Sequence, residues 1–420
     1  MLDLKAIRQQ PEEFKRKLAR KNISPDVIDT LLSADEQHRS NLQTVEALAA
    51  KQNEVSKKIP QLSGDEKMEL LAEMKSVSAE KKLAEQSLEI SKKTVKEILE
   101  SLPNPPRDEV IDGKSDEDNT VLRSVGEKPV FDFEIKEHWE LAEAMDLLDM
   151  EQAAKVSGSR FYYMKNELAI LQQALMMWAF RKVAEKGFSA TIPPFMTRAN
   201  ALHGTGYLDK DENYRVNPET DDLYLIGTSE VPMVSIHADQ IIDLDNGPLK
   251  YAAYSPCFRR EAGSYGKDTK GILRVHQFEK IEMVVFAKPE QATEIHEMIR
   301  EVEEEILQDL GIPYQVMNIC TGDLGSSASK KYDIDAWLPG QNQYREMTST
   351  SICDDYQTRR LNIRYRDENG KLQYACALNG TAISSRPLIA IMENFQQADG
   401  SIIIPEVLRM FTGFDAIRPK

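Results

Sequence analysis

The sequence predicts an α+β protein in which an antiparallel-sheet domain follows an N-terminal antiparallel helical arm. Three observations lead to this fold class. Residues 15–130 contain no Phe, Tyr or Trp, and a 3.5-residue apolar repeat runs through most of residues 26–100. From about Lys114 onward the composition changes to one with glycines, short β-rich runs and, from Phe131, aromatic residues. With 420 residues, 41% of them hydrophobic, the chain is long enough to form two domains.

The helical arm is predicted from composition and periodicity. Outside a turn at residues 60–64, the stretch from Asp26 to Leu102 has neither Gly nor Pro. At a 3.5-residue spacing, seven of ten positions between residues 27 and 59 are apolar, and so are seven of nine between residues 70 and 98. Two helices joined by so short a turn must run antiparallel. We therefore expect a coiled-coil hairpin roughly 50 Å long, at about 1.5 Å per residue.

A proline-rich segment, residues 102–106, ends the helical region and predicts a boundary there. We expect a helical domain at 1–106, with its arm at about 26–100, and a second domain at 107–420. Seven basic residues precede the arm: Lys5, Arg8, Lys15, Arg16, Lys17, Arg20 and Lys21. This basic run is either a solvated helix face or the base of an RNA-binding arm, and both interpretations stay open.

The second domain is predicted to combine strands with two long helices. The β-rich runs cover residues 223–226, 250–254, 281–286, 314–319, 332–337 and 360–365. One helix is expected over 166–186, ending at Gly187, and the other over 289–310. Regular alternation of strands and helices is absent, which favours an antiparallel sheet over a parallel one.

Composition excludes several classes of protein. A net charge of −16 argues against indiscriminate nucleic-acid binding, so any RNA contact requires a local basic patch. Four cysteines without a CxxC pair predict no structural zinc. We expect a cytoplasmic protein with no membrane partner, because no apolar run approaches the roughly 18 residues of a membrane span and residues 1–20 do not resemble a signal peptide.

The sequence does not match the common nucleotide-binding motifs. Gly113-Lys114-Ser115 has Asp108 where the first glycine of a P-loop belongs. Gly204 and Gly206 lack the third glycine of a dinucleotide fingerprint, and no kinase signature is present.

Polar motifs in the strand-rich half carry a specific resemblance. Residues 257–266 and 271–282 resemble motif 2 of class II aminoacyl-tRNA synthetases, and in particular that of the seryl-tRNA synthetase family. Further matches follow in family order at residues 227–232, 321–325, 335–341, 344–349, 378–386, 393–397 and 404–409. The coiled-coil arm is itself typical of that family. Motif 1 would then lie at about 166–194, motif 2 at about 250–286 and motif 3 at about 378–409.

The resemblance implies a ligase. It implies activation of L-serine by ATP to seryl-adenylate and transfer to tRNA(Ser), and to tRNA(Sec) where one exists, with release of AMP and diphosphate. It also implies Mg²⁺ and a homodimer formed through motif 1. No covalent enzyme intermediate is expected, so positioning of the substrates should supply most of the rate.

The resemblance also implies an ATP site. Arg259 and Arg386 would be catalytic, because two anions must be brought together and arginine can grip a phosphate in a bidentate manner. Glu261 would accept from the adenine amino group and Phe278 would stack on the ring. Glu346 and Ser349 would hold Mg²⁺, although their spacing also suits a capping pair. The full expected set is Arg259, Arg260, Glu261, Arg274, Phe278, Glu346, Met347, Thr348, Ser349 and Arg386.

The positions implied for L-serine are Thr228, Ser229, Glu230, Glu282 and Thr381. On this interpretation Glu282 and Thr381 bind the hydroxyl, while Thr228 and Glu230 bind the ammonium. A site built to bind a hydroxyl rejects alanine because its own polar groups would be left unpaired.

One departure from the family concerns motif 3. Residues 379–386 are one residue shorter than the usual spacing, and Pro387 follows Arg386, so we expect a reshaped start to motif 3 around Thr381 and Arg386. Two other functions remain open beside the primary one: an ATP-dependent ligase that loads a carrier protein, and a non-catalytic RNA-binding paralogue.

Overall fold

A computed structural model describes residues 1–208, 212–262, 268 and 270–419. Part of the predicted motif 2, residues 263–267 and 269, therefore lies outside the described residues. The chain divides into two compact units, Met1–Pro105 and Pro106–Lys420. Each unit is treated separately below.

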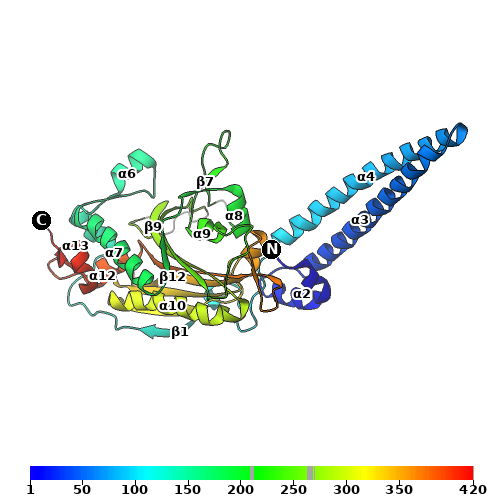
Figure 1. The fold of residues 1–420 in the computed structure, drawn as a ribbon. Helices are drawn as coiled ribbons and strands as arrows, with labels where there is room; N and C mark the ends of the chain where they lie inside the picture. The colour runs from blue at the N-terminus through cyan, green and yellow to red at the C-terminus, as the bar shows by residue number, and fades with distance from the viewer. Residues whose placement is uncertain (209–211, 263–267, 269, 420) are drawn as a thin grey trace. The chain divides into compact units, whose positions relative to one another are not determined.

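The first unit is entirely helical (Figure 1). Two short helices precede a hairpin of two long ones, which run side by side as an antiparallel pair. The arm is thus confirmed. Its elements are α1 (Leu4–Gln9), α2 (Pro11–Ala19), α3 (Asp26–Lys58), the 3-10 turn η1 (Ile59–Gln61) and α4 (Asp65–Ser101).

The polar residues of the arm's apolar repeat bind one another. Ser91 Oγ lies 3.3 Å from His38 Nδ1 and accepts from Asn41 Nδ2 at 3.1 Å. Further along the hairpin, Lys81 Nζ donates to Gln52 Oε1 at 3.2 Å. Because each polar side chain meets a polar partner on the facing helix, these residues fix the register of the two helices rather than leave unpaired groups between them.

Several residues of the basic run before the arm form ion pairs. Arg8 makes a two-point contact with the buried Asp35, with Nε to Oδ2 at 2.7 Å and Nη2 to Oδ1 at 2.5 Å. Lys15 binds Asp29 at 2.7 Å, and Arg16 binds Glu13 at 2.8 Å. These contacts favour a structural role for this part of the run.

The second unit is built on an eight-stranded sheet with the order β1-β10-β11-β12-β15-β9-β8-β4. All neighbours are antiparallel except β4 and β8, so the predicted α+β fold is confirmed. The strands are β1 (Thr120–Val125), β4 (Ser189–Thr191), β8 (Leu249–Phe258), β9 (Gln277–Ala287), β10 (Tyr314–Asn318), β11 (Lys330–Leu338), β12 (Gln343–Asp354) and β15 (Cys376–Ser384).

Helices cover the sheet. Helix α10 (Ala292–Asp309) packs on β11, β12 and β15, and α7 (Asn166–Glu185) packs on β4, β8, β9 and β15. In Figure 1, α10 runs along the lower side of the sheet, while β7 (Leu223–Leu225), α8 (Ala199–Thr205) and α9 (Glu230–Ser235) lie above it. The remaining helices are α5 (His138–Ala144), α6 (Met150–Ser157), α8 (Ala199–Thr205), α9 (Glu230–Ser235), α11 (Tyr356–Arg360), α12 (Pro387–Asn394) and α13 (Glu406–Thr412).

The smaller elements form short ladders and turns. The minor strands are β2 (Leu148–Asp149), β3 (Tyr163–Met164), β5 (Met196–Arg198), β6 (Tyr214–Arg215), β7 (Leu223–Leu225), β13 (Arg364–Arg366), β14 (Leu372–Tyr374), β16 (Ile402–Ile403) and β17 (Ala416–Ile417). The short 3-10 turns are η2 (Asp116–Asp118), η3 (Pro289–Gln291) and η4 (Pro339–Gln341). None of the helices in the described ranges is both long and apolar enough to cross a membrane.

The structure corrects one predicted strand. The run at residues 360–365 was expected to be a strand, but Arg360 ends helix α11 and only Arg364–Arg366 is extended. The reason is that Leu361, which directly follows α11, is buried where the chain leaves the helix, so its apolar side chain reports packing of that turn. Two central strands, β12 and β15, were not among the predicted runs.

Candidate functional site

A pocket of about 340 Å³ opens on the sheet, walled by side chains of β9, β11, β12 and β15 and of the loops beside them. It brings together residues that lie far apart in the sequence. Twelve of the residues singled out above line it: Thr228, Arg259, Glu230, Glu261, Phe278, Glu282, Glu346, Met347, Thr348, Ser349, Thr381 and Arg386. The pocket therefore unites the two predicted subsites in one cavity.

One part of the pocket, which we call the inner cluster, consists of Thr228, Glu230, Lys280, Glu282 and Thr381. All five side chains are buried. Lys280 Nζ donates to Thr228 Oγ1 at 2.8 Å and forms a close ion pair with Glu282, whose Oε2 also accepts from Thr381 Oγ1 at 3.3 Å. Burial raises the pKa of Glu282, and the nearby Lys280 charge opposes that shift.

The hydroxyl of Thr228 is oriented by its neighbours. Its Oγ1 accepts from the Glu230 backbone N–H at 3.1 Å as well as from Lys280 Nζ at 2.8 Å. A hydroxyl has two acceptor lone pairs and one hydrogen, so in this arrangement Thr228 can only donate to a ligand. It does not offer an acceptor for an ammonium group.

Glu230 is held by two hydrogen-bond donors, Tyr207 on the pocket wall and Gln357 outside it. Its Oε2 accepts from Tyr207 Oη at 2.8 Å, and its Oε1 accepts from Gln357 Nε2 at 2.7 Å. Burial, reinforced by the Glu230 charge, raises the pKa of Tyr207 well above its usual value, so Tyr207 remains a hydrogen donor. Two donors therefore fix the Glu230 carboxylate in one orientation.

Arg259, just after β8, is held by two contacts. Its Nε donates to the Gly227 carbonyl at 3.1 Å, and its guanidinium lies 5.1 Å from the centroid of the Phe278 ring. The Phe278 ring thus packs beside the arginine. Both side chains line the pocket.

Glu261 carries a positive φ of 49° and accepts from Arg274 Nη1 at 2.9 Å. A left-handed backbone at a non-glycine residue is uncommon and often marks a functional turn. Arg274 also faces Asp268, at 3.7 Å, and Asp268 is bound by Arg345 Nη2 at 2.6 Å. This chain of charges links the two ends of the motif 2 loop to β12.

A β-bulge places Glu346 and Ser349 on one wall. Along β12, Thr348 pairs with Ile334 and Glu346 pairs with Asp335, so Met347 is an extra residue. Without the bulge, residues three apart in a strand would face opposite sides of the sheet. With it, both side chains line the pocket.

Arg386 reaches this wall from the start of α12. Its Nη1 donates to the Glu346 carbonyl oxygen at 2.9 Å and lies 3.7 Å from the Glu346 carboxylate. Burial acts to raise the pKa of Glu346, but the charges of Arg386, Lys331, Arg259 and Arg274 outweigh it and lower that pKa. The carboxylate therefore stays ionised. Despite the shorter motif 3 segment, Thr381 and Arg386 both line the pocket.

The oxygen atoms of Glu346 and Ser349 suit Mg²⁺, which prefers hard oxygen ligands and commonly binds one or two carboxylates together with substrate phosphates. No group of three His, Cys, Asp or Glu side chains in the described part of the chain could hold a metal ion by itself. Phosphate oxygens and water would have to complete the coordination.

Three expected residues lie outside the pocket wall. Ser229 is buried, with its Oγ donating to the Ala253 carbonyl at 3.2 Å. Arg260 is exposed, and its guanidinium lies 6.0 Å from the Tyr214 ring centroid. Arg274 does not line the pocket but binds Glu261, which does.

Sequence reasoning missed other lining residues: Tyr207, Lys280, Asp323, Lys331, Ser351 and Asn379. A signal existed for Lys280, because Lys280 and Glu282 are two residues apart in a strand and must share a face. No comparable signal existed for Tyr207, which comes from a loop 23 residues before its partner Glu230.

Comparison with known proteins identifies the family. Residues 1–106 match the model of the seryl-tRNA synthetase N-terminal domain, and residues 214–395 match that of the class II tRNA synthetase core domain (G, H, P, S and T). The serine--tRNA ligase of Corynebacterium glutamicum is 46% identical over 100% of this chain and 99% of its own length. The enzyme of Nocardia farcinica is 45% identical, with both chains fully covered.

Solved structures support the same family. The seryl-tRNA synthetase of Pyrococcus horikoshii complexed with ATP superposes with a TM-score of 0.93 at 41% identity, covering 100% of both chains. The cytoplasmic serine-tRNA ligase of Naegleria fowleri in complex with AMP gives 0.86 at 31% identity, covering 98% of this chain and 96% of that one. Matched along its whole length by these relatives, the chain belongs to the seryl-tRNA synthetase family of class II aminoacyl-tRNA synthetases.

Proposed function

We propose that this protein activates L-serine with ATP and transfers the seryl group to tRNA(Ser). The observation that carries the proposal is one pocket lined both by two buried carboxylates, Glu230 and Glu282, and by the arginines Arg259 and Arg386. Carboxylates suit an ammonium and a hydroxyl, whereas arginines suit phosphates. Such a pocket can hold a small polar amino acid and a nucleotide together.

The reaction requires two negatively charged groups to meet. A serine carboxylate oxygen attacks the α-phosphorus of ATP, forming the seryl-adenylate as diphosphate leaves. A ribose hydroxyl at the tRNA end then attacks the carbonyl carbon, and AMP leaves. Arg259 and Arg386 would neutralise charge in the first step, and no covalent bond to the enzyme is needed in either.

The remaining pocket residues supply binding. We assign adenine to Glu261 and Phe278, and the β12 wall of Glu346, Met347, Thr348 and Ser349 to the phosphate side. Mg²⁺ held there by Glu346 and Ser349 would shield phosphate charge. Because Thr228 can only donate in this structure, we assign the serine ammonium to Glu230 and the serine hydroxyl to Glu282 and Thr381.

Two features support tRNA as the acceptor. Residues 1–106 match the seryl-tRNA synthetase N-terminal domain, which a carrier-loading ligase has no need for. The charged residues of the site are intact, which disfavours a non-catalytic paralogue. We extend the proposal to tRNA(Sec) where one exists, and we place the protein in the cytoplasm, where tRNA is charged for translation.

We also propose a homodimer. Exposed apolar side chains lie on α7 and just after β4, the region expected to form motif 1: Ile170, Met177, Ile192 and Phe195. Large apolar side chains gathered in one region of sequence are typical of an interface. A second copy of this chain would bury them.

The deciding experiment is ATP–diphosphate exchange measured with serine, threonine, alanine, glycine and cysteine in turn. We expect strong exchange with serine. Alanine should be poorer by about 10⁴-fold in kcat/KM, because it leaves Glu282 and Thr381 without a partner. Exchange that did not depend on serine would overturn the proposed function.

Shortening the arm should separate activation from charging. We would remove residues 42–86 and reconnect the helices with the turn sequence of residues 59–64, which keeps the Asn41–Ser91 contact. Exchange with serine should stay within about twofold, whereas kcat/KM for tRNA should fall by about 10²-fold or more, through lost backbone contacts. An equal loss of both activities would show that the arm serves folding rather than tRNA binding.

A further inference from the structure

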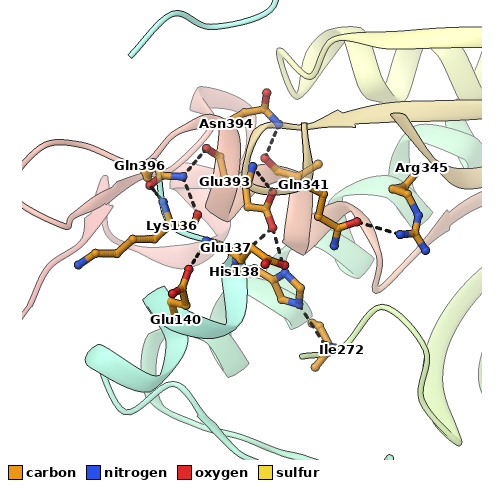
Figure 2. A network of polar contacts seen from close by, with 12 residues as sticks. Lys136, Glu137, His138, Glu140, Ile272, Gln341, Arg345, Glu393, Asn394 and Gln396 are labelled. Atoms are coloured by element: carbon orange, nitrogen blue, oxygen red, sulfur yellow. Dashed lines mark hydrogen bonds and ion pairs between the residues drawn. The ribbon is translucent and has the colours of Figure 1, made fainter. Parts of the chain in front are cut away.

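A buried histidine at the start of α5 ties together three segments around the pocket (Figure 2). The Glu393 Oε1 atom accepts from the His138 backbone N–H and lies 3.0 Å from His138 Nδ1, while its Oε2 accepts from the Gly340 N–H at 3.0 Å. On the other side of the ring, the Ile272 N–H donates to His138 Nε2 at 3.2 Å. His138 and Glu393 are both almost completely buried.

These contacts determine where the ring proton lies. A backbone N–H can only donate, so His138 Nε2 must be the acceptor and carry no hydrogen. The proton is then on Nδ1, which donates to the Glu393 carboxylate. The imidazole acts as a relay between a carboxylate on α12 and a backbone amide at the end of the motif 2 loop.

The loop fits the ring closely. Gly271 has a φ of +67°, and a Cβ atom added there would lie 1.9 Å from His138 Nε2. Only glycine gives the backbone both that conformation and that proximity. Beside it, Lys270 Nζ lies 3.8 Å from the centroid of the Trp139 ring. Residues 270–272 therefore pack against the first residues of α5.

These contacts with α5 position part of the pocket wall. Ile272 and Leu273 line the pocket directly, and Arg274 binds Glu261 from the next position. At the other end of the relay, Glu393 belongs to α12, the helix that begins directly after Arg386. The relay thus joins the segment between the two proposed adenine contacts, Glu261 and Phe278, to the helix that follows Arg386, a proposed phosphate contact.

We propose that His138 is a positioning residue for ATP: it holds residues 271–274 in place through the Ile272 amide while Glu393 holds its ring. The proposal rests on the function proposed above. His138 itself does not line the pocket, so its effect is indirect. Loss of the relay should weaken ATP binding selectively, because the inner cluster is built from other segments.

Two substitutions separate the halves of the relay. In His138→Asn the amide nitrogen can replace Nδ1, but the Ile272 N–H loses its acceptor. In His138→Gln the amide oxygen can replace Nε2 and keep that acceptor. In serine-dependent exchange, we expect His138→Asn to raise KM for ATP by about 10- to 100-fold with KM for serine nearly unchanged. His138→Gln should stay within about threefold of the wild type.

Gly271→Ala tests the relay from the loop side. It should raise KM for ATP as His138→Asn does, and the double variant should be no worse than the poorer single one, because both remove the same contact. The control is His296→Gln, another buried histidine, whose Nε2 lies 3.0 Å from the Thr350 carbonyl oxygen beneath the sheet. It should lower the thermal unfolding midpoint without an ATP-selective change in KM.

Hydrogen exchange of the Ile272 amide, measured without substrates, tests the relay independently of the proposed function. It should be faster in His138→Asn than in the wild type or His138→Gln. Equal exchange in all three proteins would overturn the relay. So would an increase in KM for serine equal to that for ATP. A wild type that lacks serine-dependent exchange would instead overturn the proposed function, and amide exchange would still decide the relay.

Discussion

Arg259→Lys is expected to lower kcat for serine-dependent ATP–diphosphate exchange by about 10²- to 10³-fold, the usual effect of losing one preorganised contact to developing charge. In the structure, Nε is bound to the Gly227 carbonyl and the guanidinium plane rests near Phe278. These contacts aim the two Nη groups of the fork. A lysine ammonium has neither the plane nor the fork, so it cannot keep the Gly227 contact and grip a phosphate in the same geometry.

Arg260→Lys is the matched control. Arg260 is the next residue and has the same chemistry, but it is exposed and lies beside Tyr214 rather than on the pocket wall. We expect less than a twofold change in kcat. KM for serine should remain within about twofold of the wild type in both variants. Equal losses in the two variants would contradict the assignment of this phosphate contact to Arg259 rather than to Arg260.

The arm and the fold class could be predicted from sequence because each has a periodic signature. The 3.5-residue repeat specifies a helical hairpin whatever lies around it. The central strands β12 and β15 have no such signature. They carry residues such as Glu346, Ser349 and Thr381 on their pocket side, so they do not show the apolar alternation by which strands are recognised.

The site was predictable only as far as the family resemblance reaches. Motif matching selected Arg259 and Glu282, which line the pocket, but it also selected Ser229, whose hydroxyl faces the backbone of β8. Adjacent residues in a motif need not share a direction. Conversely, the role of Met347 as a bulge that turns Glu346 and Ser349 to one side depends on cross-strand register, which one strand's sequence does not contain.

The second large effect is expected at the serine subsite. Glu282→Gln should raise KM for serine by about 10²-fold or more, while KM for ATP stays within about threefold. The carboxylate is buried, pairs with Lys280 and accepts from Thr381 Oγ1. Glutamine keeps the shape but removes the charge, leaving Lys280 without its ion-pair partner where such a loss is costly. Exchange rates measured against serine at a fixed ATP concentration, and against ATP at a fixed serine concentration, give the two KM values.

Thr381→Val is the graded control. It removes one donor to Glu282 with little change in shape, so KM for serine should rise only about tenfold. Thr381 and Glu282 pair across β15 and β9, and both variants leave Arg259 and the β12 wall untouched. Equal increases in KM for serine and ATP in Glu282→Gln would indicate a collapsed pocket rather than a lost serine contact.

The pH dependence of KM for serine distinguishes the charge of Glu282 from its shape. Burial raises the pKa of Glu282 above its ordinary value of 4.5, Lys280 and Arg259 oppose the shift, and Glu230 reinforces it. The serine-binding form is the ionised one, and it is lost as the pH falls through this raised value. KM for serine should therefore rise on acidification at a pH where an ordinary glutamate is still ionised.

In Glu282→Gln the residue no longer titrates, so this part of the acid-side rise should disappear. An unchanged pH profile in this variant would contradict the assignment of the acid-side rise to Glu282.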